Sequence, residues 1–495
     1  MTQLGAQDAQ FLYMETADNH IQVTGAAVFD PSTVPGGKIV RFKDILAHIE
    51  SRLHMSPVFR RRLVRVPFEL DFPYWADDEN FDLEYHVQHC RLPEPGDWRQ
   101  FCIHLSRFHA RPLDQARPLW EMMVIEGLDR IEKFPAGSYA IATKVHHAAV
   151  DGTSILNFYR ALMDIDNKGT PAVPPESVEA THTAKPGLVE MAGRAALNNL
   201  RSPIAITDAI MRSAPALYRY TQNALSSRSE TTEDVPDTRF NCNASPHKMF
   251  DATTVPLDDL KSIRTAVRGS TVNDVVLSIC GGALRKYLKH HGELPAESLV
   301  AWVPINARHA RDDEAETSGN RLTSMTTRIF TTVEDPLERL RLIHASTRES
   351  KAARAGVSAR LMTDLSQHVP SATLVTAGRL VLRAGMAASL CNLFVSNVPG
   401  PQVPMYMNGA RQIGGYALAP LVDGMGLFIA TPSYDGTVTF NVTSTRETLP
   451  DIDFFVACID AAAEELREKA LGKPTRKRTK KKTKKKSAPR RKARS

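Results

Sequence analysis

The chain has 495 residues, more than one hydrophobic core normally supports, so we expect two core-bearing domains. No window approaches the roughly 18 to 20 uncharged apolar residues of a membrane-spanning helix, and the amino terminus lacks the basic start and apolar core of a signal peptide. These observations favour a cytoplasmic protein. The net charge is +7, but the last 23 residues hold fourteen Lys or Arg and no acidic residue, so the rest of the chain carries about −7.

In the first half, the most informative segment is the junction between an expected strand and the loop after it. Ser138–Val145 has the pattern of a buried strand, and it runs directly into His146-His147-Ala148-Ala149-Val150-Asp151-Gly152. A histidine can remove the proton of an attacking hydroxyl at pH 7, because its pKa lies near neutrality. We therefore interpret His147 as the general base of an acyl transfer from a thioester. His146 would pack beside it, Asp151 would brace the loop, and Gly152 would allow a tight turn.

Simpler interpretations of the same residues exist. The two histidines could be satisfied polar residues at a strand end, or half of a metal site. The spacing of the whole seven-residue string favours acyl transfer to a hydroxyl or amine without a covalent enzyme intermediate. We expect no bound metal and no cofactor. The chain also lacks the GxSxG elbow of a serine nucleophile, which argues against a lipase-like route.

Composition shifts divide the chain into four parts. Residues 1–166 form an amino-terminal domain, which ends in an expected helix capped by Thr153 or Ser154. Residues 167–239 form a linker that is rich in Pro, Thr and Ala and contains a helical connector at about 187–226. Residues 240–470 form a carboxy-terminal domain, and residues 471–495 form a disordered polybasic tail.

The second domain alternates expected strands and helices. A helix is expected from Val272, with Asn273 and Asp274 in its first turn, where a carboxylate suits the helix dipole. That placement is also an ordinary stabilising device, so it does not by itself indicate a site. Ser396 and Asn397 precede a rigid Val-Pro-Gly-Pro turn at a strand end. The expected strands are 298–304, 323–332, 391–398, 427–431 and 437–443, and the further helices are about 336–353 and 451–469.

The cysteines and the basic tail suggest compartment and partners. The six cysteines show no CxxC or metal-ligand spacing, so we expect them to be reduced and buried. The basic residues of Lys473–Ser495 would attract an anionic membrane or lipid-droplet surface at about 1 kcal/mol each. Nucleic acid would attract them too, and we favour the membrane or droplet surface. We therefore expect a cytoplasmic protein associated peripherally with the inner membrane face or with lipid droplets.

Motifs spread over most of the chain resemble one family. The string from His146 to Gly152 matches the HHxxxDG motif of the superfamily that contains chloramphenicol acetyltransferase, carnitine acyltransferases and peptide-synthetase condensation domains. Within that superfamily, the ordered set resembles the bacterial wax ester synthase/acyl-CoA:diacylglycerol acyltransferase family. The other short motifs that match this family are Asp8–Glu15, Phe81–Leu83, Pro112–Asp114, Arg117–Glu121 with Trp120, Val272–Val276 with Asn273 and Asp274, Val303–Asn306, Gly319–Asn320 and Ser396–Pro401.

The resemblance implies a fold and a reaction. It implies an α/β fold of two chloramphenicol-acetyltransferase-like domains, each a mixed sheet flanked by helices, with an active-site tunnel between them. Acyl-CoA would supply the acyl group, and diacylglycerol or a long-chain alcohol would accept it. Trp120, Gly152, Asn273, Asp274, Ser396 and Asn397 would bind substrate or support the site. Trp120 could instead be simply a core anchor, and we favour that interpretation.

Two departures from the family pattern concern the acceptor more than the reaction. Ile305-Asn306 follows Val303-Pro304 where the family usually has a serine or another small polar residue, and Phe440–Arg446 is less typical than the rest. Two alternatives therefore remain beside the neutral-lipid acyltransferase. One is a related HHxxxDG acyltransferase with a different hydroxyl or amine acceptor, and the other is a non-catalytic protein that binds lipid droplets through its tail.

Overall fold

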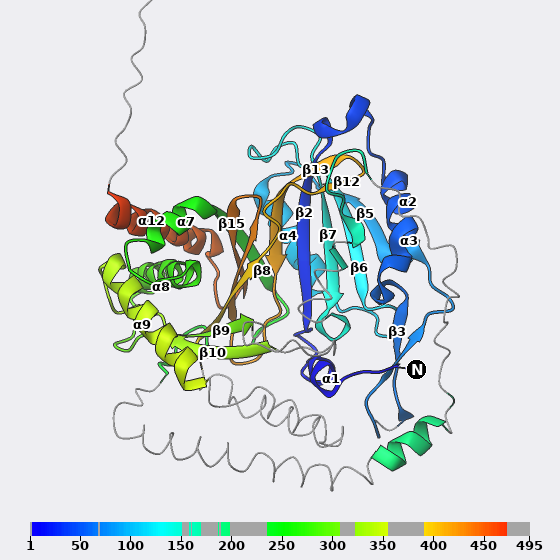
Figure 1. Cartoon of the computed structure of the whole chain (residues 1–495), viewed down its shortest axis with the longest axis horizontal. Helices are drawn as coiled ribbons and strands as arrows, with labels where there is room; N and C mark the ends of the chain where they lie inside the picture. Colours follow the sequence, from blue (N-terminus) through cyan, green and yellow to red (C-terminus); the bar gives the residue numbers. More distant parts are fainter. Residues whose placement is uncertain are drawn as a thin grey trace, which may run out of the picture.

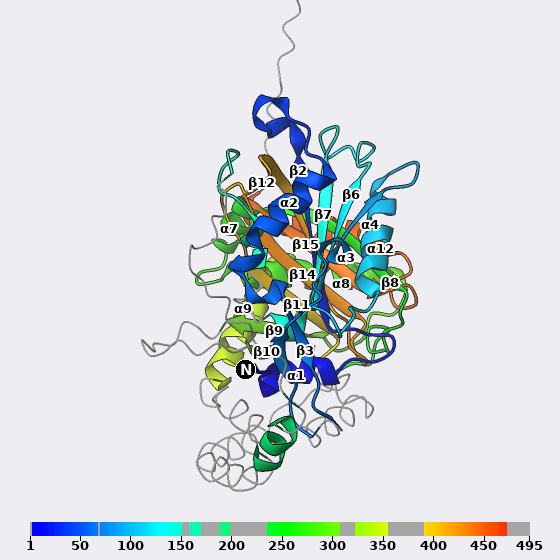
Figure 2. The ribbon, with the colours of Figure 1, turned by 90° about the vertical axis from the view of Figure 1, so that its right-hand side faces the viewer.

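A computed structural model of the chain describes residues 2–67, 70–150, 158–159, 161–169, 187, 190–198, 235–306, 322–354 and 391–472. The described part contains two six-stranded sheets and a three-stranded sheet. Helices cover the faces of the two large sheets (Figures 1 and 2). The protein therefore has the α/β architecture with two sheet-rich units that the sequence predicts.

The first large sheet has the strand order β12-β13-β2-β7-β6-β5. All neighbouring pairs are antiparallel except β5 and β6, which are parallel. Every residue of β7 is buried, as expected for a central strand with both faces covered. The strands are β2 (Gln22–Asp30), β5 (Val87–Arg91), β6 (Trp120–Glu126), β7 (Tyr139–His146), β12 (Tyr406–Met407) and β13 (Ala410–Leu418).

Two helices lie on opposite faces of this sheet (Figure 2). On one face, Ile45 and Ile49 of α2 (Phe42–Arg52) pack with Phe29 and Trp120. On the other face, α4 (Trp98–Ala110) buries apolar side chains against Ala26 and Val28 of β2. Because successive side chains of a strand point to opposite faces, β2 contributes to both cores.

The second large sheet has the order β10-β9-β11-β14-β15-β8. Its strands are β8 (Lys248–Pro256), β9 (Val300–Asn306), β10 (Leu322–Arg328), β11 (Leu393–Pro399), β14 (Leu427–Tyr434) and β15 (Thr437–Thr445). Strand β11 is parallel to β9 and β14, and the other pairs are antiparallel. Helices α7 (Leu257–Arg264), α8 (Val272–His290), α9 (Pro336–Arg354) and α12 (Ile452–Leu471) lie beside it (Figure 1). Most of the expected strands and helices of this half are confirmed to within a few residues.

Helix α8 is the central helix of this half, and two features of its sequence explain its position. Thr271 and Asp274 form a capping box that satisfies backbone N–H groups at its start. Gly281 and Gly282 allow close packing, because a Cβ atom at Gly281 would overlap the Ile329 carbonyl oxygen and one at Gly282 would lie 3.0 Å from the Cβ of Ala462. The backbone of α8 therefore packs closely against α12 and against Ile329, the residue that follows β10, with no room for a side chain between them.

Two strands of the carboxy-terminal half, β12 and β13, belong to the first sheet. Strand β13 pairs with β2 from Leu418↔Thr24 to Arg411↔Asp30. The side chains of Asn441 and Thr443 accept hydrogen bonds from the backbone N–H groups of Ala417 (3.0 Å) and Ala419 (3.2 Å). The expected division at residue 240 therefore separates two chain segments, but strands β12 and β13 of the second segment belong to the first sheet.

Smaller elements complete the described structure. The three-stranded sheet has the order β1-β4-β3, with β1 (Thr2–Gln3), β3 (Arg61–Val64) and β4 (Tyr74–Asp77). Further helices are α1 (Ala6–Tyr13) and α3 (Leu83–His86), with the short 3-10 helices η1 (Pro31–Thr33), η2 (Pro35–Gly37), η3 (Leu53–Met55), η4 (Pro57–Phe59) and η6 (His147–Ala149). Among the described helices, none is both long and apolar enough to span a bilayer.

The expected connector and tail lie largely outside the described residues. Residues 190–198 are helical, and Met191 and Ala195 pack against Val64 and Tyr74 of the small sheet. Residues 158–159 and 161–162 are also helical, in agreement with the expected helix after the histidine motif. The remainder of the connector, the start of that helix and the tail from Lys473 onward are outside the described ranges.

Candidate active site

The two histidines of the motif lie where the central strand β7 ends. His146 is the last residue of β7, and His147 begins the 3-10 helix η6. The backbone N–H of His146 donates to the Leu119 carbonyl oxygen at 3.0 Å, and that of His147 donates to the Ile21 carbonyl oxygen at 2.9 Å. The turn is therefore held on both sides, by the segments that lead into β6 and β2.

The two hydrogen bonds of His146 indicate which ring nitrogen carries a proton. Its Nδ1 accepts from the backbone N–H of Ala148 at 3.0 Å, so the ring proton lies on Nε2. The Nε2–H group donates to Oε1 of Glu15 at 3.1 Å. Only 1% of the His146 side chain is exposed. His146 is thus a buried ring that caps the turn bearing His147.

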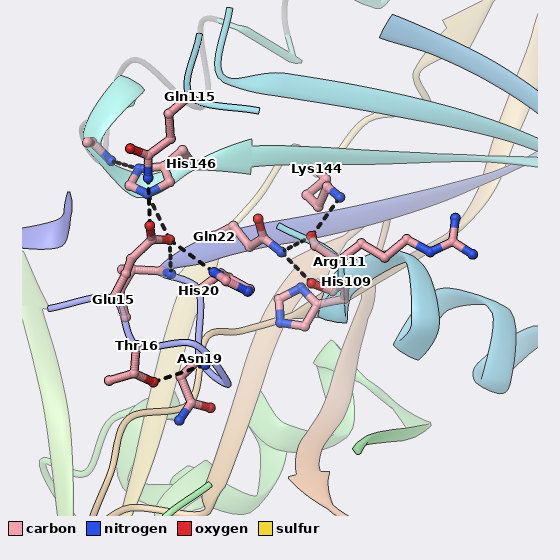
Figure 3. A network of polar contacts seen from close by, with 12 residues as sticks. Glu15, Thr16, Asn19, His20, Gln22, His109, Arg111, Gln115, Lys144 and His146 are labelled. Carbon is pink, nitrogen blue, oxygen red and sulfur yellow. Dashed lines mark hydrogen bonds and ion pairs between the residues drawn. The ribbon is translucent and has the colours of Figure 1, made fainter. Parts of the chain in front are cut away.

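Glu15 is the acceptor at the centre of this network (Figure 3). It follows α1 by two residues, and its carboxylate also accepts from the Ile21 backbone N–H at 3.0 Å and from Gln115 Nε2 at 2.8 Å. His20 Nδ1 lies 3.7 Å from Oε1. Burial raises the pKa of Glu15, but the hydrogen bond from His146 and the nearby ring of His20 outweigh burial and hold the pKa at about 2. Glu15 is therefore ionised at neutral pH.

His147 is half-buried, and its ring packs against the ring of Phe11 with centroids 4.1 Å apart. Burial lowers the pKa of His147 to about 4. The imidazole is therefore neutral at pH 7 and has a lone pair available to accept a proton. Chemically, the turn presents an unprotonated base beside a second histidine that is fixed by a carboxylate.

A second polar cluster, which includes Lys144 and His109, lies beside this network (Figure 3). The buried Lys144 Nζ lies 3.0 Å from Oε2 of Glu121 and donates to the carbonyl oxygens of Phe108 (3.1 Å) and Arg111 (3.0 Å). His109 contacts Thr24 Oγ1 at 2.9 Å, and burial lowers the pKa of His109 to about 3. These partners fix the end of β7 two residues before His146.

The loop after Glu15 connects this site to the carboxy-terminal half. Asn19 Nδ2 donates to the Ala244 carbonyl oxygen at 2.8 Å and to Oδ1 of Asp423 at 2.9 Å. Asn19 Oδ1 accepts a hydrogen bond from Lys248 Nζ. Asn19 is 2% exposed, so both halves of the chain hold the segment that positions Glu15.

Comparison with known proteins gives the family. The model of the wax ester synthase/diacylglycerol acyltransferase catalytic domain matches residues 4–276, and that of the WS/DGAT C-terminal domain matches residues 318–467. A putative diacylglycerol O-acyltransferase of Mycobacterium tuberculosis CDC 1551 is 32% identical over 96% of this chain and 92% of its own length. The chain belongs to the wax ester synthase/diacylglycerol acyltransferase family. It is an acyltransferase, as the motif and the resemblance predict.

Solved structures give the same family and fold. The wax ester synthase/diacylglycerol acyltransferase from Marinobacter aquaeolei VT8 has a TM-score of 0.66 and 26% identity over 95% of this chain and 100% of its own. The first condensation domain of the CDA synthetase has a TM-score of 0.53 and 14% identity over 94% of this chain and 95% of its own. The second likeness concerns the fold alone, which is the two-domain fold that the sequence predicts.

Among the expected site residues, Trp120 lies in the core of this acyltransferase. Its side chain is fully buried, its Nε1 donates to the Phe59 carbonyl oxygen at 3.0 Å, and its ring stacks on His86 with centroids 4.5 Å apart. Asp151 and Gly152 lie outside the described residues. Glu15, His20, Gln115 and Lys144 join the site although the motif did not indicate them. Glu15 is the last residue of the Asp8–Glu15 motif, and the resemblance of that motif to the family was the one feature of the sequence that could have indicated it.

The expected residues of the second half occupy an end of helix α8 and strand β11. The buried Asp274 accepts from the Thr271 backbone N–H and from Thr347 Oγ1, both at 2.9 Å, and its Oδ2 lies 3.1 Å from His344 Nδ1. Its partners are those of a structural cap. Asn273, Ser396 and Asn397 are half-buried, and no hydrogen bond within the described part of the chain joins them to His146 or His147.

The structure has two cavities among the described residues, and neither is lined by the histidines of the HHxxxDG motif. One, of about 380 Å³, is lined by residues that include His48, Arg52 and Asp164, and the other, of about 500 Å³, lies against β10 and α9. Neither includes His146 or His147. The tunnel expected from the family resemblance therefore stays a prediction.

Proposed function

We propose that this protein transfers a long-chain acyl group from acyl-CoA to diacylglycerol, to a long-chain fatty alcohol, or to both, with His147 as general base. The products would be triacylglycerol and wax ester. The observation that supports this best is the turn after β7, where a neutral His147 stands beside a fixed His146. The names of the relatives, diacylglycerol O-acyltransferase and wax ester synthase, support the class of acceptor.

The proposed reaction needs one proton to be moved twice. His147 takes the proton of the acceptor hydroxyl as its oxygen attacks the thioester carbonyl carbon, which forms a tetrahedral intermediate. The intermediate collapses with cleavage of the carbon–sulfur bond, and the imidazolium returns the proton to the coenzyme A thiolate. No cofactor or metal enters these steps. Half-burial of His147 supports a site that limits hydrolysis of the thioester by water.

The developing oxyanion requires a hydrogen-bond donor. The candidates are the backbone amide of Gly152, the side chain of Asn273 and the strand end at Ser396 and Asn397. Asp151 would brace the loop after the histidines. Asp274 and Trp120 would act at a distance, through the start of α8 and through the core beside β7.

We also propose that the basic tail places the enzyme on a membrane or lipid-droplet surface. Fourteen basic residues between Lys473 and Ser495 would hold the enzyme on an anionic membrane or droplet surface, where both acceptors dissolve. Removal of residues 473–495 should weaken flotation with vesicles that contain anionic lipid. The same deletion should leave turnover of detergent-dispersed substrates unchanged.

The decisive experiment measures release of free coenzyme A from palmitoyl-CoA with hexadecanol, with dioleoylglycerol and without acceptor. It compares the wild type with His147→Ala and with His247→Ala, a control because His247 is exposed and pairs with Glu447 at 2.7 Å. Release that requires an acceptor and is lost only in His147→Ala is the expected result. The relative rates with the two acceptors then give the preference.

Other outcomes would contradict parts of the proposal. Undiminished acceptor-dependent release in His147→Ala would exclude His147 as the base. Absence of release with both acceptors, from a folded protein, would exclude the neutral-lipid acceptors and leave another hydroxyl or amine acceptor, or a droplet-binding role.

A further inference from the structure

Glu15 and His146 are 131 residues apart in the sequence and form a direct hydrogen bond of 3.1 Å. The carboxylate lies outside the HHxxxDG motif and stands at the end of a different element, after α1. Figure 3 shows the carboxylate pointing at the ring of His146, and the other ring nitrogen accepts from the Ala148 N–H. This pairing assigns the acidic residue a role that the motif does not indicate.

We propose that Glu15 is a positioning residue of the acyl-transfer site, which holds His146 in its Nε2–H tautomer and thereby fixes the turn that presents His147. The inference rests on the proposed function, because it assumes that His147 is the reacting base. Glu15 itself would not touch substrate.

The first step of the argument is the tautomer of His146. A neutral imidazole has one N–H donor and one bare nitrogen acceptor. Glu15 is an ionised carboxylate that can only accept, so it requires the proton on Nε2. Nδ1 is then free to accept the Ala148 N–H at 3.0 Å, which closes the turn. In the other tautomer, two donors, the Nδ1–H and the Ala148 N–H, would face each other. Two acceptors, the bare Nε2 and the Glu15 carboxylate, would also face each other, so both hydrogen bonds would be lost.

The second step is a separate path from Glu15 to His147 through one peptide unit. The N–H group of Ile21 donates to Glu15 Oε1 at 3.0 Å, and the carbonyl oxygen of Ile21 accepts from the His147 N–H at 2.9 Å. Glu15 therefore fixes the chain on both sides of the catalytic turn, at the His146 side chain and at the Ile21 backbone. Loss of the carboxylate would loosen both.

The third step is that Glu15 is itself held in place. Gln115 Nε2 donates to Oε2 at 2.8 Å, and Gln115 Oε1 accepts from Arg65 Nη2 at 2.5 Å. The loop that follows is fixed by the bonds of Asn19 to Ala244 and Asp423. A carboxylate fixed from three directions is a partner suited to orienting a histidine, as acidic residues do in other acyl-transfer sites.

The test compares Glu15→Gln, Glu15→Ala and the control Asp18→Asn. The glutamine variant keeps an oxygen that can accept from His146 and Ile21 but loses the charge, whereas the alanine variant loses both. Asp18 is an exposed carboxylate three residues away in the same loop. We expect kcat to fall about 10- to 100-fold in Glu15→Gln and further in Glu15→Ala, with KM for palmitoyl-CoA within about twofold of the wild type. Asp18→Asn should match the wild type.

A second readout reports the tautomer without any turnover. Two-bond ¹⁵N–¹H correlations of ¹⁵N-histidine-labelled protein, assigned with a His146→Gln variant, should give His146 the Nε2–H pattern in the wild type and lose it in Glu15→Ala. Wild-type kcat in Glu15→Gln, or an Nε2–H pattern retained in Glu15→Ala, would overturn the proposal. Activity that survives in His147→Ala would contradict the assigned base instead, and the tautomer spectra would still decide the role of Glu15.

Discussion

At the scale of single residues, burial sets the protonation state of the proposed base. Burial lowers the pKa of His147 from its ordinary value near 6.5 to about 4. A general base acts in its neutral form, so activity is lost as the pH falls through the pKa. We predict that kcat/KM for palmitoyl-CoA is constant between about pH 6 and pH 8 and declines only as the pH approaches about 4.

Thioester absorbance followed at each pH measures this profile, and circular dichroism at the same pH values confirms that the protein is folded. A decline centred near pH 6.5 would mean that His147 titrates as an exposed histidine, or that another group is the base.

The buried Lys144 gives a prediction about stability. Its side chain is fully buried, and Glu121, its partner at 3.0 Å, is 14% exposed. Lys144→Met keeps the length of the side chain but leaves the Glu121 carboxylate without its cation. We predict that the free energy of unfolding falls by about 3–5 kcal/mol, as is usual when one partner of a buried ion pair is removed.

Urea unfolding of the single variant and of Lys144→Met/Glu121→Gln measures this effect. The second change removes the unpaired charge, so the double variant should recover part of the loss. Equal stabilities of the two variants would contradict this explanation, because they would show that the unpaired Glu121 carboxylate does not destabilise the protein.

At the scale of elements, the packing of α8 depends on a glycine. A Cβ atom at Gly281 would overlap the Ile329 carbonyl oxygen, whereas one at Gly193, in the helix at residues 190–198, would meet nothing within 4 Å. We predict that Gly281→Ala lowers stability by about 1–3 kcal/mol, because backbone must move to admit the methyl group. Gly193→Ala should be neutral or stabilise the helix by up to about 1 kcal/mol. Thermal unfolding of the two variants tests this prediction. An unchanged melting temperature in Gly281→Ala would contradict the close packing of α8.

The sequence predicted the elements whose pattern is local. The buried run Ser138–Val145, the apolar face that begins at Val272 and the helices near 336 and 451 appear as β7, α8, α9 and α12. Strand β13 was missed because Gly414 and Gly415 interrupt its apolar alternation and because its partner β2 lies almost 400 residues away. The same physics applies to the site, where the motif indicates His146 and His147 but the tautomer of His146 depends on Glu15.

At the scale of the whole molecule, the two sheets share one chain segment. Strand β13 belongs in sequence to the carboxy-terminal half, yet it pairs with β2 along nearly its full length. Phe250 of β8 and Tyr416 of β13 pack with Phe101 of α4 in one apolar cluster. A cut between the halves would therefore expose an unpaired edge on β2 and uncover part of a core.

The pairing of β13 with β2 predicts how the halves behave when they are produced separately. Residues 1–239 alone should aggregate and lack activity, because β2 would be an uncovered edge strand and Asn19 would lose Ala244, Asp423 and Lys248. Co-expression of residues 1–239 with 240–495 should restore a soluble complex and acceptor-dependent release of coenzyme A, because β13 can pair with β2 from a separate chain. Size-exclusion chromatography and the release assay measure both results. A soluble, monomeric amino-terminal half with wild-type turnover would mean that neither strand β13 nor the Asn19 contacts are needed to hold the turn that bears His147.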